Sequence, residues 1–307
     1  MRFNSEKVAF GRHETFSLRY SWLPKGFQAI TDKDFDITDA DSATVRLGVG
    51  KNMVSAIRYW LRACRMVEQD CMSPSKLGGL ILAKDGYDPY LEDEATLWLI
   101  HWLLATNSEQ ATAWFWFFNK FHRPEFTGQE LQSALSDFLK ESIIQGKRPA
   151  TNTLKSDATL IPRMYAGAKQ TLKISLEESL DSPLALLRLI TRATGEKGFV
   201  SKPESRPGLP VGIFAFAVTQ LMQHKNVTSI PIEELLYSRD EYAAPGSIFR
   251  LTETDLVTKL EQMVYAVKGM YEIRETAGIH QLYMMSEVVA EDYLKYHYLG
   301  IEQEVAA

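Results

Sequence analysis

The strongest pattern in the chain is the separation of charged and apolar positions between Lys51 and Arg65. At about 100° per residue, the basic residues fall on one side of a predicted helix and the apolar residues on the other. No acidic residue occurs between Asp41 and Glu68. The pattern predicts an amphipathic helix with one buried face and one face suited to anions. The anion-facing side holds Lys51, Arg58, Arg62 and Arg65, with Asn52, Ser55 and Tyr59 beside it.

The residues before this helix favour a helix-turn-helix. Residues 39–46 can form a short helix, and Leu47-Gly-Val-Gly50 is typical of a tight turn in which glycine relieves the backbone. In a DNA-binding helix-turn-helix the second helix enters the major groove. Lys and Arg would then hold phosphates, while Asn52 and Ser55 could reach base edges. The alternative is a solvated charged face on an ordinary core helix.

The middle of the chain reads as helical. The apolar tract from Leu97 to Phe118 is interrupted at residues 106–110, which predicts two buried helices, and each is too short to span a bilayer. Asp88-Pro89 is expected to start the first of them, and Thr127 with Glu130 predicts a capping box on a helix over 127–144. Residues 77–83 could be a strand or a short buried helix, and a wing after the Lys51 helix would lie between 66 and 90. Residues 145–158 are expected to form a linker or an exposed loop.

The last third of the chain has its own order of elements. We expect a helix over 211–224, a strand near 227–230, a helix over 231–236, and a helix capped by Thr252 or Thr254 that runs to Val267. A hairpin over 271–283 follows, and this is the order of a winged helix. The predicted fold class is therefore mainly α, with an N-terminal winged-helix or helix-turn-helix domain over 1–87, a helical region over 88–200 and a second winged-helix-like domain over 201–307. The acidic residues of the 251–267 helix suit protein pairing or a homodimer better than DNA.

Composition narrows the class of protein. The 307 residues are 45% hydrophobic and 24% charged with a net charge of −5, so any DNA contact must come from a local basic patch. The two cysteines, Cys64 and Cys71, indicate no disulfide framework, which suits a reducing cytoplasm. Neither a signal-peptide core nor a membrane span is predicted.

Two candidate sites carry chemistry. Residues 8–30 place Arg12, His13, Glu14, Arg19 and Lys25 among aromatic residues. His13 could act as a general base, Glu14 could hold a metal and Arg12 could stabilise a pentacoordinate phosphate. Arg19 and Lys25 are expected to add DNA contacts. The structural alternative is a buried ion-pair and hydrogen-bond network that anchors the N-terminal segment.

The second candidate is a metal site near the predicted helix start at Asp88. Asp88, Glu92 and Asp93, with Glu14, could hold Mg²⁺ or Mn²⁺, since phosphodiester cleavage commonly uses carboxylate-held divalent cations. The alternative is that acids in a first helical turn complement the helix dipole. Gly48-Val-Gly-Lys51 is no phosphate-binding loop. That motif needs a glycine five residues before its Gly-Lys pair and a serine or threonine after the lysine, but position 45 is valine and position 52 is asparagine.

Several segments resemble a known bacterial family. They are Phe10-Gly-Arg-His-Glu-Thr-Phe16, Trp22-Leu-Pro-Lys25, Leu47-Gly-Val-Gly-Lys-Asn-Met53, Ile57-Arg-Tyr-Trp60, Asp88-Pro-Tyr-Leu-Glu-Asp93, Leu97-Trp-Leu99, Pro245-Gly-Ser-Ile-Phe-Arg-Leu251 and Glu275-Thr-Ala-Gly-Ile-His-Gln281. The family was long catalogued as a domain of unknown function and is encoded beside DNA phosphorothioation genes. Its best-described members are the SspB-type nicking components of single-stranded phosphorothioation systems.

The resemblance implies action on DNA, with a cysteine desulfurase, an ATPase and an ATP-pyrophosphatase-like sulfur transferase as partner proteins. We therefore expect a cytoplasmic, DNA-binding, metal-dependent nickase of a phosphorothioation-linked defence system. The alternatives are a non-catalytic winged-helix adaptor that recruits the phosphorothioation partners to DNA, and a transcriptional regulator.

Overall fold

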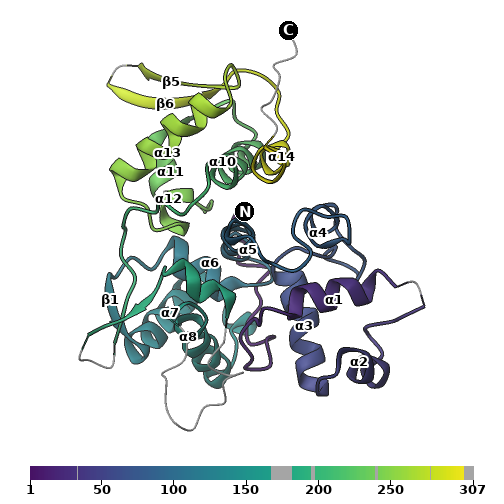
Figure 1. Cartoon of the computed structure of the whole chain (residues 1–307). Coiled ribbons are helices and arrows are strands. Elements are labelled where there is room, and N and C mark those ends of the chain that lie inside the picture. Colours follow the sequence, from purple (N-terminus) through teal and green to yellow (C-terminus); the bar gives the residue numbers. More distant parts are fainter. Residues whose placement is uncertain (33, 167–181, 195–197, 239–240, 277, 301–307) are drawn as a thin grey trace. The chain divides into compact units, whose positions relative to one another are not determined.

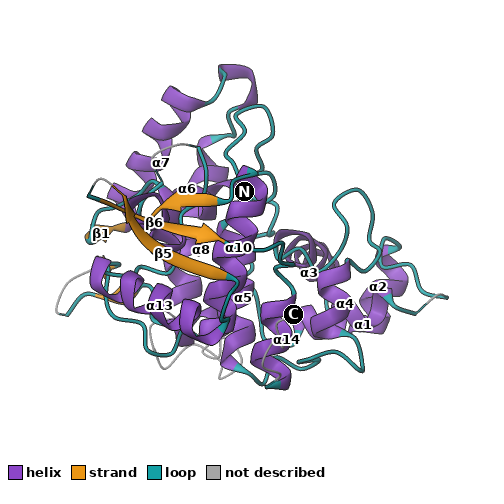
Figure 2. Cartoon of the chain, turned by 90° about the horizontal axis from the view of Figure 1, so that it is seen from above, coloured by secondary structure: helices purple, strands orange, loops and turns teal. Residues whose placement is uncertain are grey.

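Helices dominate the structure, a computed structural model that describes all residues except 33, 167–181, 195–197, 239–240, 277 and 301–307 (Figure 2). The strands described form two small antiparallel sheets of three strands each. The prediction of a mainly α protein is confirmed. Contacts divide the chain into a larger unit (residues 4–117 and 123–202) and a smaller unit (residues 1–3, 118–122 and 203–307). The division into three domains (1–87, 88–200 and 201–307) stays a prediction.

The larger unit begins with four helices, in which α1 packs against the other three and α2 also packs against α3 (Figure 1). Gly48 ends α2 in the left-handed conformation (φ 65°), and Gly50 precedes α3. The short helix, the glycine turn and the amphipathic helix predicted from the sequence are confirmed. The helices are α1 (Trp22–Ile30), α2 (Ala40–Leu47), α3 (Lys51–Ala63) and α4 (Lys76–Leu82).

The expected wing after α3 is not confirmed. Residues 64–92 are all described, and their strand pairing is limited to one antiparallel bridge between Val67 and Pro74. The segment 77–83, for which a strand or a helix was open, belongs to α4. Ser75 caps this helix by accepting a hydrogen bond from the backbone N–H of Gly78 at 2.9 Å.

The two predicted core helices, α5 (Glu94–Ala105) and α6 (Thr112–Asn119), are confirmed. The aromatic run from Trp114 to Phe118 is buried, and His101 is buried with Nδ1 2.8 Å from the hydroxyl of Tyr165. The predicted start of α5 at Asp88-Pro89 is wrong, because Asp93 is the N-cap and Leu91 has a positive φ of 60°. Within the described part of the chain, no helix has the length and apolar character needed to cross a bilayer.

The rest of the larger unit contains a confirmed capping box. Thr127 accepts from the backbone N–H of Glu130 at 3.2 Å, and Glu130 accepts from the backbone N–H of Thr127 at 2.8 Å. The loop predicted over 145–158 is only partly present, because α8 begins at Thr151 and buries Leu154, Asp157 and Ala158. The elements are β1 (Glu125–Thr127), α7 (Gly128–Ser142), η1 (Gln145–Lys147), α8 (Thr151–Ala166), η2 (Pro183–Leu187), β2 (Thr191–Arg192) and β3 (Gly198–Val200), with sheet order β1-β3-β2.

The smaller unit holds the helices and the hairpin predicted for the last third of the chain (Figure 1). Thr252 caps α13, and its side chain accepts from the backbone N–H of Asp255 at 3.1 Å. The sheet has the order β4-β6-β5, with Ile230 opposite Leu282. The elements are α10 (Val211–Lys225), β4 (Ser229–Pro231), α11 (Ile232–Leu236), α12 (Pro245–Ile248), α13 (Glu253–Ala266), β5 (Tyr271–Thr276), β6 (Ile279–Met284) and α14 (Asp292–Leu299).

Candidate nucleic-acid interface

Helix α3 has one apolar face in the core and one polar face toward solvent. Val54, Ile57 and Trp60 on its apolar face are at most 1% exposed. On the opposite face Lys51, Asn52 and Ser55 are exposed, while Arg58 and Arg62 are half-buried. Arginine in this position can bury its aliphatic stem and keep its guanidinium near solvent.

Acidic side chains from the preceding segment lie at the start of this polar face. Lys51 forms an exposed ion pair with Asp41 at 2.7 Å, and Arg46 of α2 pairs with Asp32 at 2.9 Å. Asp36 is close enough to Arg58 for the arginine charge to lower the pKa of Asp36, after the larger effect of its hydrogen bonds from Thr38. The first turn of α3 therefore carries less net positive charge than its sequence indicates.

Two arginines further along α3 lie near a third arginine from the N-terminal segment. Arg58 and Arg62 are one helical turn apart, and Arg12 comes from the N-terminal segment. Burial lowers the pKa of Arg62, and the charges of Arg58 and Arg12 lower it further. No carboxylate of the described residues forms an ion pair with any of the three. We call Arg12, Arg58 and Arg62 the arginine cluster.

Two predicted DNA contacts lie elsewhere. Tyr59 is buried at 6% exposure, with its ring 6.1 Å from that of His13, which removes it from the exposed stripe. Arg65 lies beyond the end of α3 with a positive φ of 57°, and its guanidinium donates to the carbonyl of Thr106 at 3.0 Å. Burial lowers the pKa of Arg65 to about 10. Both residues connect α3 to the core.

Arg19 lies just before α1, and Lys25 lies within it. The guanidinium carbon of Arg19 is 5.3 Å from the ring centre of Trp22, a cation–π arrangement that leaves Arg19 half-buried. Lys25 is exposed on α1. The interactions shown for these two residues do not link them to the arginine cluster.

His13, predicted as a general base, is fully buried. Its Nε2 lies 2.7 Å from Oδ1 of Asp157, and its Nδ1 accepts from the backbone N–H of Thr15 at 3.0 Å. An Nδ1 that accepts a hydrogen bond carries no proton, so the proton of the ring is on Nε2 and is donated to Asp157. Both nitrogens are thus engaged within the protein, which is the arrangement of the structural alternative. Glu14, next in the chain, is exposed and has a positive φ of 50°.

Asp157, the buried partner of His13, was not among the residues predicted from the sequence. Burial raises the pKa of its carboxyl, although hydrogen bonds from His13 and from the backbone N–H of Gly11 oppose this rise. Its Oδ2 is buried and has no hydrogen-bond partner among the described residues. One signal was available, because Asp157 falls on the apolar stripe of α8 formed by Leu154, Ala158 and Ile161.

The predicted metal ligands do not converge. Both oxygens of Asp88 accept hydrogen bonds, Oδ1 from the backbone N–H of Glu92 at 2.8 Å and Oδ2 from that of Asp93 and the hydroxyl of Thr96. Asp93 caps α5 by accepting from Ala95 at 2.8 Å. Among the described residues there is no group of three or more His, Cys, Asp or Glu side chains that could hold a metal. These carboxylates organise the start of α5.

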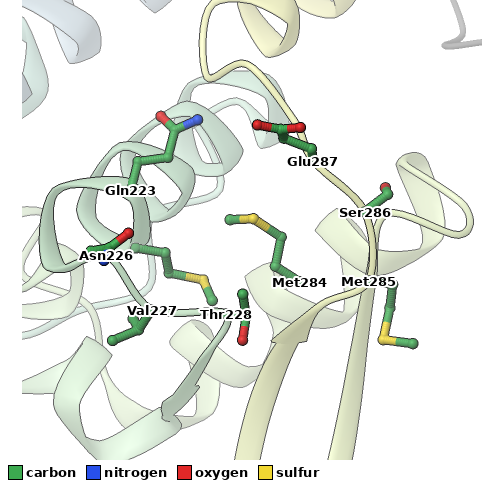
Figure 3. Close-up of a pocket in the computed structure, with 9 residues that line it drawn as sticks. Gln223, Asn226, Val227, Thr228, Met284, Met285, Ser286 and Glu287 are labelled. Carbon is green, nitrogen blue, oxygen red and sulfur yellow. The ribbon is translucent and has the colours of Figure 1, made fainter.

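A separate open pocket lies in the smaller unit, between the end of α10 and the end of β6 (Figure 3). Its volume is about 480 Å³, and none of the nine described residues that line it is basic. Met284, the last residue of β6, points into the pocket. With thioethers, amides and the carboxylate of Glu287 as its lining, this pocket does not suit a phosphate.

Together the fold and the arginine cluster define a mainly helical protein with a local positively charged patch. The chain belongs to the family described as "Protein of unknown function (DUF4007)", which matches residues 10–298. It is similar to two crystal structures of SspB, one of them magnesium ion-bound, at 29% sequence identity over 98% of this chain and 92% of those chains. The TM-scores are 0.83 for the magnesium-bound structure and 0.82 for the other. No curated protein matches the chain.

Proposed function

We propose that this protein binds DNA through the polar face of α3 and acts as a DNA nickase in a phosphorothioation-linked defence system. One observation carries the DNA-binding part. The second helix of a helix–glycine turn–helix presents Arg58 and Arg62, next to Arg12, with no carboxylate of the described residues in an ion pair with them. Backbone phosphates are the natural counter-charges for such a helix. The similarity to SspB supports the defence role.

We further propose that the smaller unit is a winged helix that serves protein contacts. The order helix, strand, three helices and hairpin, with the short α12 between α11 and α13, and the strand order β4-β6-β5 support this. Helix α13, in the place of a recognition helix, carries Glu253, Asp255 and Glu261, and Lys259 is buried with Nζ donating to the carbonyl of Leu209 at 2.7 Å. A negative surface would repel DNA and suits a second copy of the chain or the phosphorothioation partner proteins.

Magnesium is the cation to test, because one of the similar SspB structures is magnesium ion-bound. The carboxylates proposed as ligands from the sequence do not fit a resident ion, since both oxygens of Asp88 and one of Asp93 already accept hydrogen bonds. Glu14 and Glu92 are the exposed members of that set. We therefore assign no catalytic step to a metal.

A second candidate function is a non-catalytic adaptor that recruits partners to DNA. The observation in its favour is that both oxygens of Asp88, both ring nitrogens of His13 and Oδ1 of Asp157 are already engaged in hydrogen bonds inside the protein. In this reading the arginine cluster binds DNA and no hydrolysis follows. A transcriptional regulator would differ from the adaptor by sequence-specific binding.

A supercoiled-plasmid assay separates these functions. The purified protein is incubated with plasmid and Mg²⁺, with Mn²⁺ in parallel and EDTA as control, beside Glu14→Ala, Glu92→Ala and Asp93→Ala. DNA binding is measured for each variant by fluorescence anisotropy. Lys140→Ala is the matched control, since Lys140 is an exposed cation on α7 already paired with Asp137 at 2.9 Å.

Metal-dependent open circles that disappear in a variant which still binds DNA would support the nickase and locate its site. Binding without nicking, in the absence and presence of the partner proteins, would replace the nickase by the adaptor. If Arg58→Ala and Arg62→Ala both bind and nick DNA like the wild type, the role given to α3 is overturned.

A further inference from the structure

Arg12 is presented by a loop whose backbone is fixed on both sides. The backbone N–H of Gly11 donates to Oδ1 of Asp157 at 2.9 Å, and Nε2 of His13 lies 2.7 Å from the same oxygen. The loop is tightly wound, since Gly11, Glu14 and Thr15 all have positive φ (68°, 50° and 65°). Left-handed non-glycine residues are strained and persist where the surrounding structure holds them. One carboxylate on α8 thus holds the residues before and after Arg12.

The same loop is seated on α3. The ring of His13 stacks on that of Trp60, with 6.4 Å between ring centres, and lies edge-on to Tyr59 at 6.1 Å. The indole N–H of Trp60 donates to the carbonyl of Phe16 at 3.2 Å, which ties the other end of the loop to the helix. Tyr59 and Trp60 lie between Arg58 and Arg62 in the helix. The loop therefore delivers Arg12 beside these two arginines.

None of the three arginines forms an ion pair with a carboxylate in the part of the chain that the structure describes. The buried Nε of Arg58 has no hydrogen-bond partner among the described residues. Like charges one helical turn apart repel each other, and the half-buried position of Arg58 and Arg62 reduces screening by water. The charge of Arg58 lowers the pKa of Asp36, whose exposed carboxylate accepts two hydrogen bonds from Thr38. The fold keeps this repulsion in place, as expected of a site preorganised for an anion.

We propose that Arg12, Arg58 and Arg62 form a built oxyanion site that takes a single phosphate group, and that Asp157, through His13 and Gly11, is the positioning residue for Arg12. Guanidinium groups present forked donors that match the geometry of a phosphate. The phosphate could belong to a nucleic-acid backbone or be a free ion. The identification with a backbone phosphate rests on the DNA-binding function proposed above, whereas the anion site itself does not.

Cys71 provides a reporter that is independent of DNA. It is exposed and close enough to Arg62 for the two side chains to interact electrostatically, so it lies near the arginine cluster. The other cysteine of the chain, Cys64, is fully buried, and burial raises its pKa. An anionic and a cationic methanethiosulfonate reagent of equal size are used to modify Cys71, and the ratio of the two rates measures the local potential. Cys71→Ser gives the background rate.

The wild-type protein is expected to react faster with the anionic reagent. Loss of one nearby unit charge in Arg12→Ala should lower the anionic-to-cationic rate ratio on the order of threefold at moderate salt. Asp157→Asn, which keeps an acceptor oxygen, should lower it less than Asp157→Ala, and Lys140→Ala should leave it unchanged. Inorganic phosphate should slow the anionic reagent more than chloride at equal ionic strength. A ratio near one, or a ratio unchanged in Arg12→Ala, would overturn the site.

In the second part of the experiment, a short single-stranded DNA and a short DNA duplex are tested for protection of Cys71 from the reagents. Protection of Cys71 by micromolar DNA, lost in Arg12→Ala, assigns the site to a backbone phosphate. Protection by phosphate alone, with no DNA binding at any salt, keeps the oxyanion site and rejects the proposed DNA-binding function. DNA binding that is equal in wild type and in the Arg12, Arg58 and Arg62 variants keeps that function and rejects the site.

Discussion

The carboxylate of Asp157 lies 2.7 Å from Nε2 of His13, although 144 positions separate the two residues in the sequence. The pair is almost fully buried, at 1% and 0% side-chain exposure. It connects the N-terminal loop to α8, and the ring of His13 in turn packs against Trp60 and Trp114. We propose that this pair holds Arg12 in the arginine cluster. Substitution of Asp157 is therefore the most direct test of what the pair contributes to the larger unit.

Asp157→Ala should destabilise the larger unit by about 2–4 kcal/mol, because it leaves two buried donors, the Gly11 N–H and the His13 Nε2–H, without an acceptor. Asp157→Asn should cost much less, since the amide oxygen can accept from both. Denaturant unfolding followed by tryptophan fluorescence measures this, because all six tryptophans lie between residues 22 and 116. Equal losses in the two variants would contradict the proposed hydrogen bonding.

Gly11→Ala should be more damaging than Gly48→Ala. Both glycines have a similar positive φ, 68° and 65°, but a Cβ on Gly11 would lie 2.4 Å from Cγ2 of Thr153, while one on Gly48 would meet nothing within 4 Å. Gly48→Ala should thus cost only the left-handed backbone, about 1–2 kcal/mol. Adding Thr153→Ser to Gly11→Ala removes the clashing methyl and should bring its cost down to that of Gly48→Ala. The same unfolding assay tests this, and no recovery in the double variant would rule out the steric explanation.

The double variant Arg58→Ala, Arg62→Ala should weaken DNA binding and flatten its dependence on salt. Each lost phosphate contact should reduce the slope of log K against log salt by about 0.9, so the pair should reduce it by about 2. Anisotropy titrations over a series of salt concentrations give the slope, with Lys140→Ala as the control for loss of charge. Equal affinity and slope in the double variant and the wild type would show that α3 does not contact the phosphates.

Local signals account for the parts of the fold that the sequence predicted. The α2–turn–α3 segment has a period, a glycine turn and a charge pattern, all within 25 residues, and the Thr127–Glu130 box lies within four. The start of α5 was placed too early because Asp88-Pro89 has the local signature of a cap. In the structure Asp88 instead accepts hydrogen bonds from three donors, on Glu92, Asp93 and Thr96, and the helix begins after Asp93.

The candidate site was predictable only in part, for a related reason. The positive face of α3 follows from helical periodicity, but the position of Arg12 beside it depends on a loop held by Asp157, far away in the chain. Arg65 and Tyr59 share the periodicity of the basic face, and yet packing turns them toward the core. A single sequence holds no signal for the pairing of residues 13 and 157, beyond the oddity of an acid on an apolar stripe.

The capping box of α7 gives a pH-dependent prediction. Hydrogen bonds from the backbone and side chain of Thr127 lower the pKa of Glu130 below its ordinary value of about 4.3. A group with a depressed folded-state pKa stabilises the protein above its ordinary pKa, and this contribution is lost as pH falls through the folded-state pKa. The stability difference between wild type and Glu130→Gln should therefore shrink on acidification from about pH 6 to pH 3.

Tryptophan fluorescence measures this difference, because the ring centre of Trp116 lies 6.0 Å from that of Phe138 on α7. Asp137→Asn is the control for loss of a negative charge from the same helix. A difference that stays constant over this pH range would show that the ionised Glu130 is not what caps the helix.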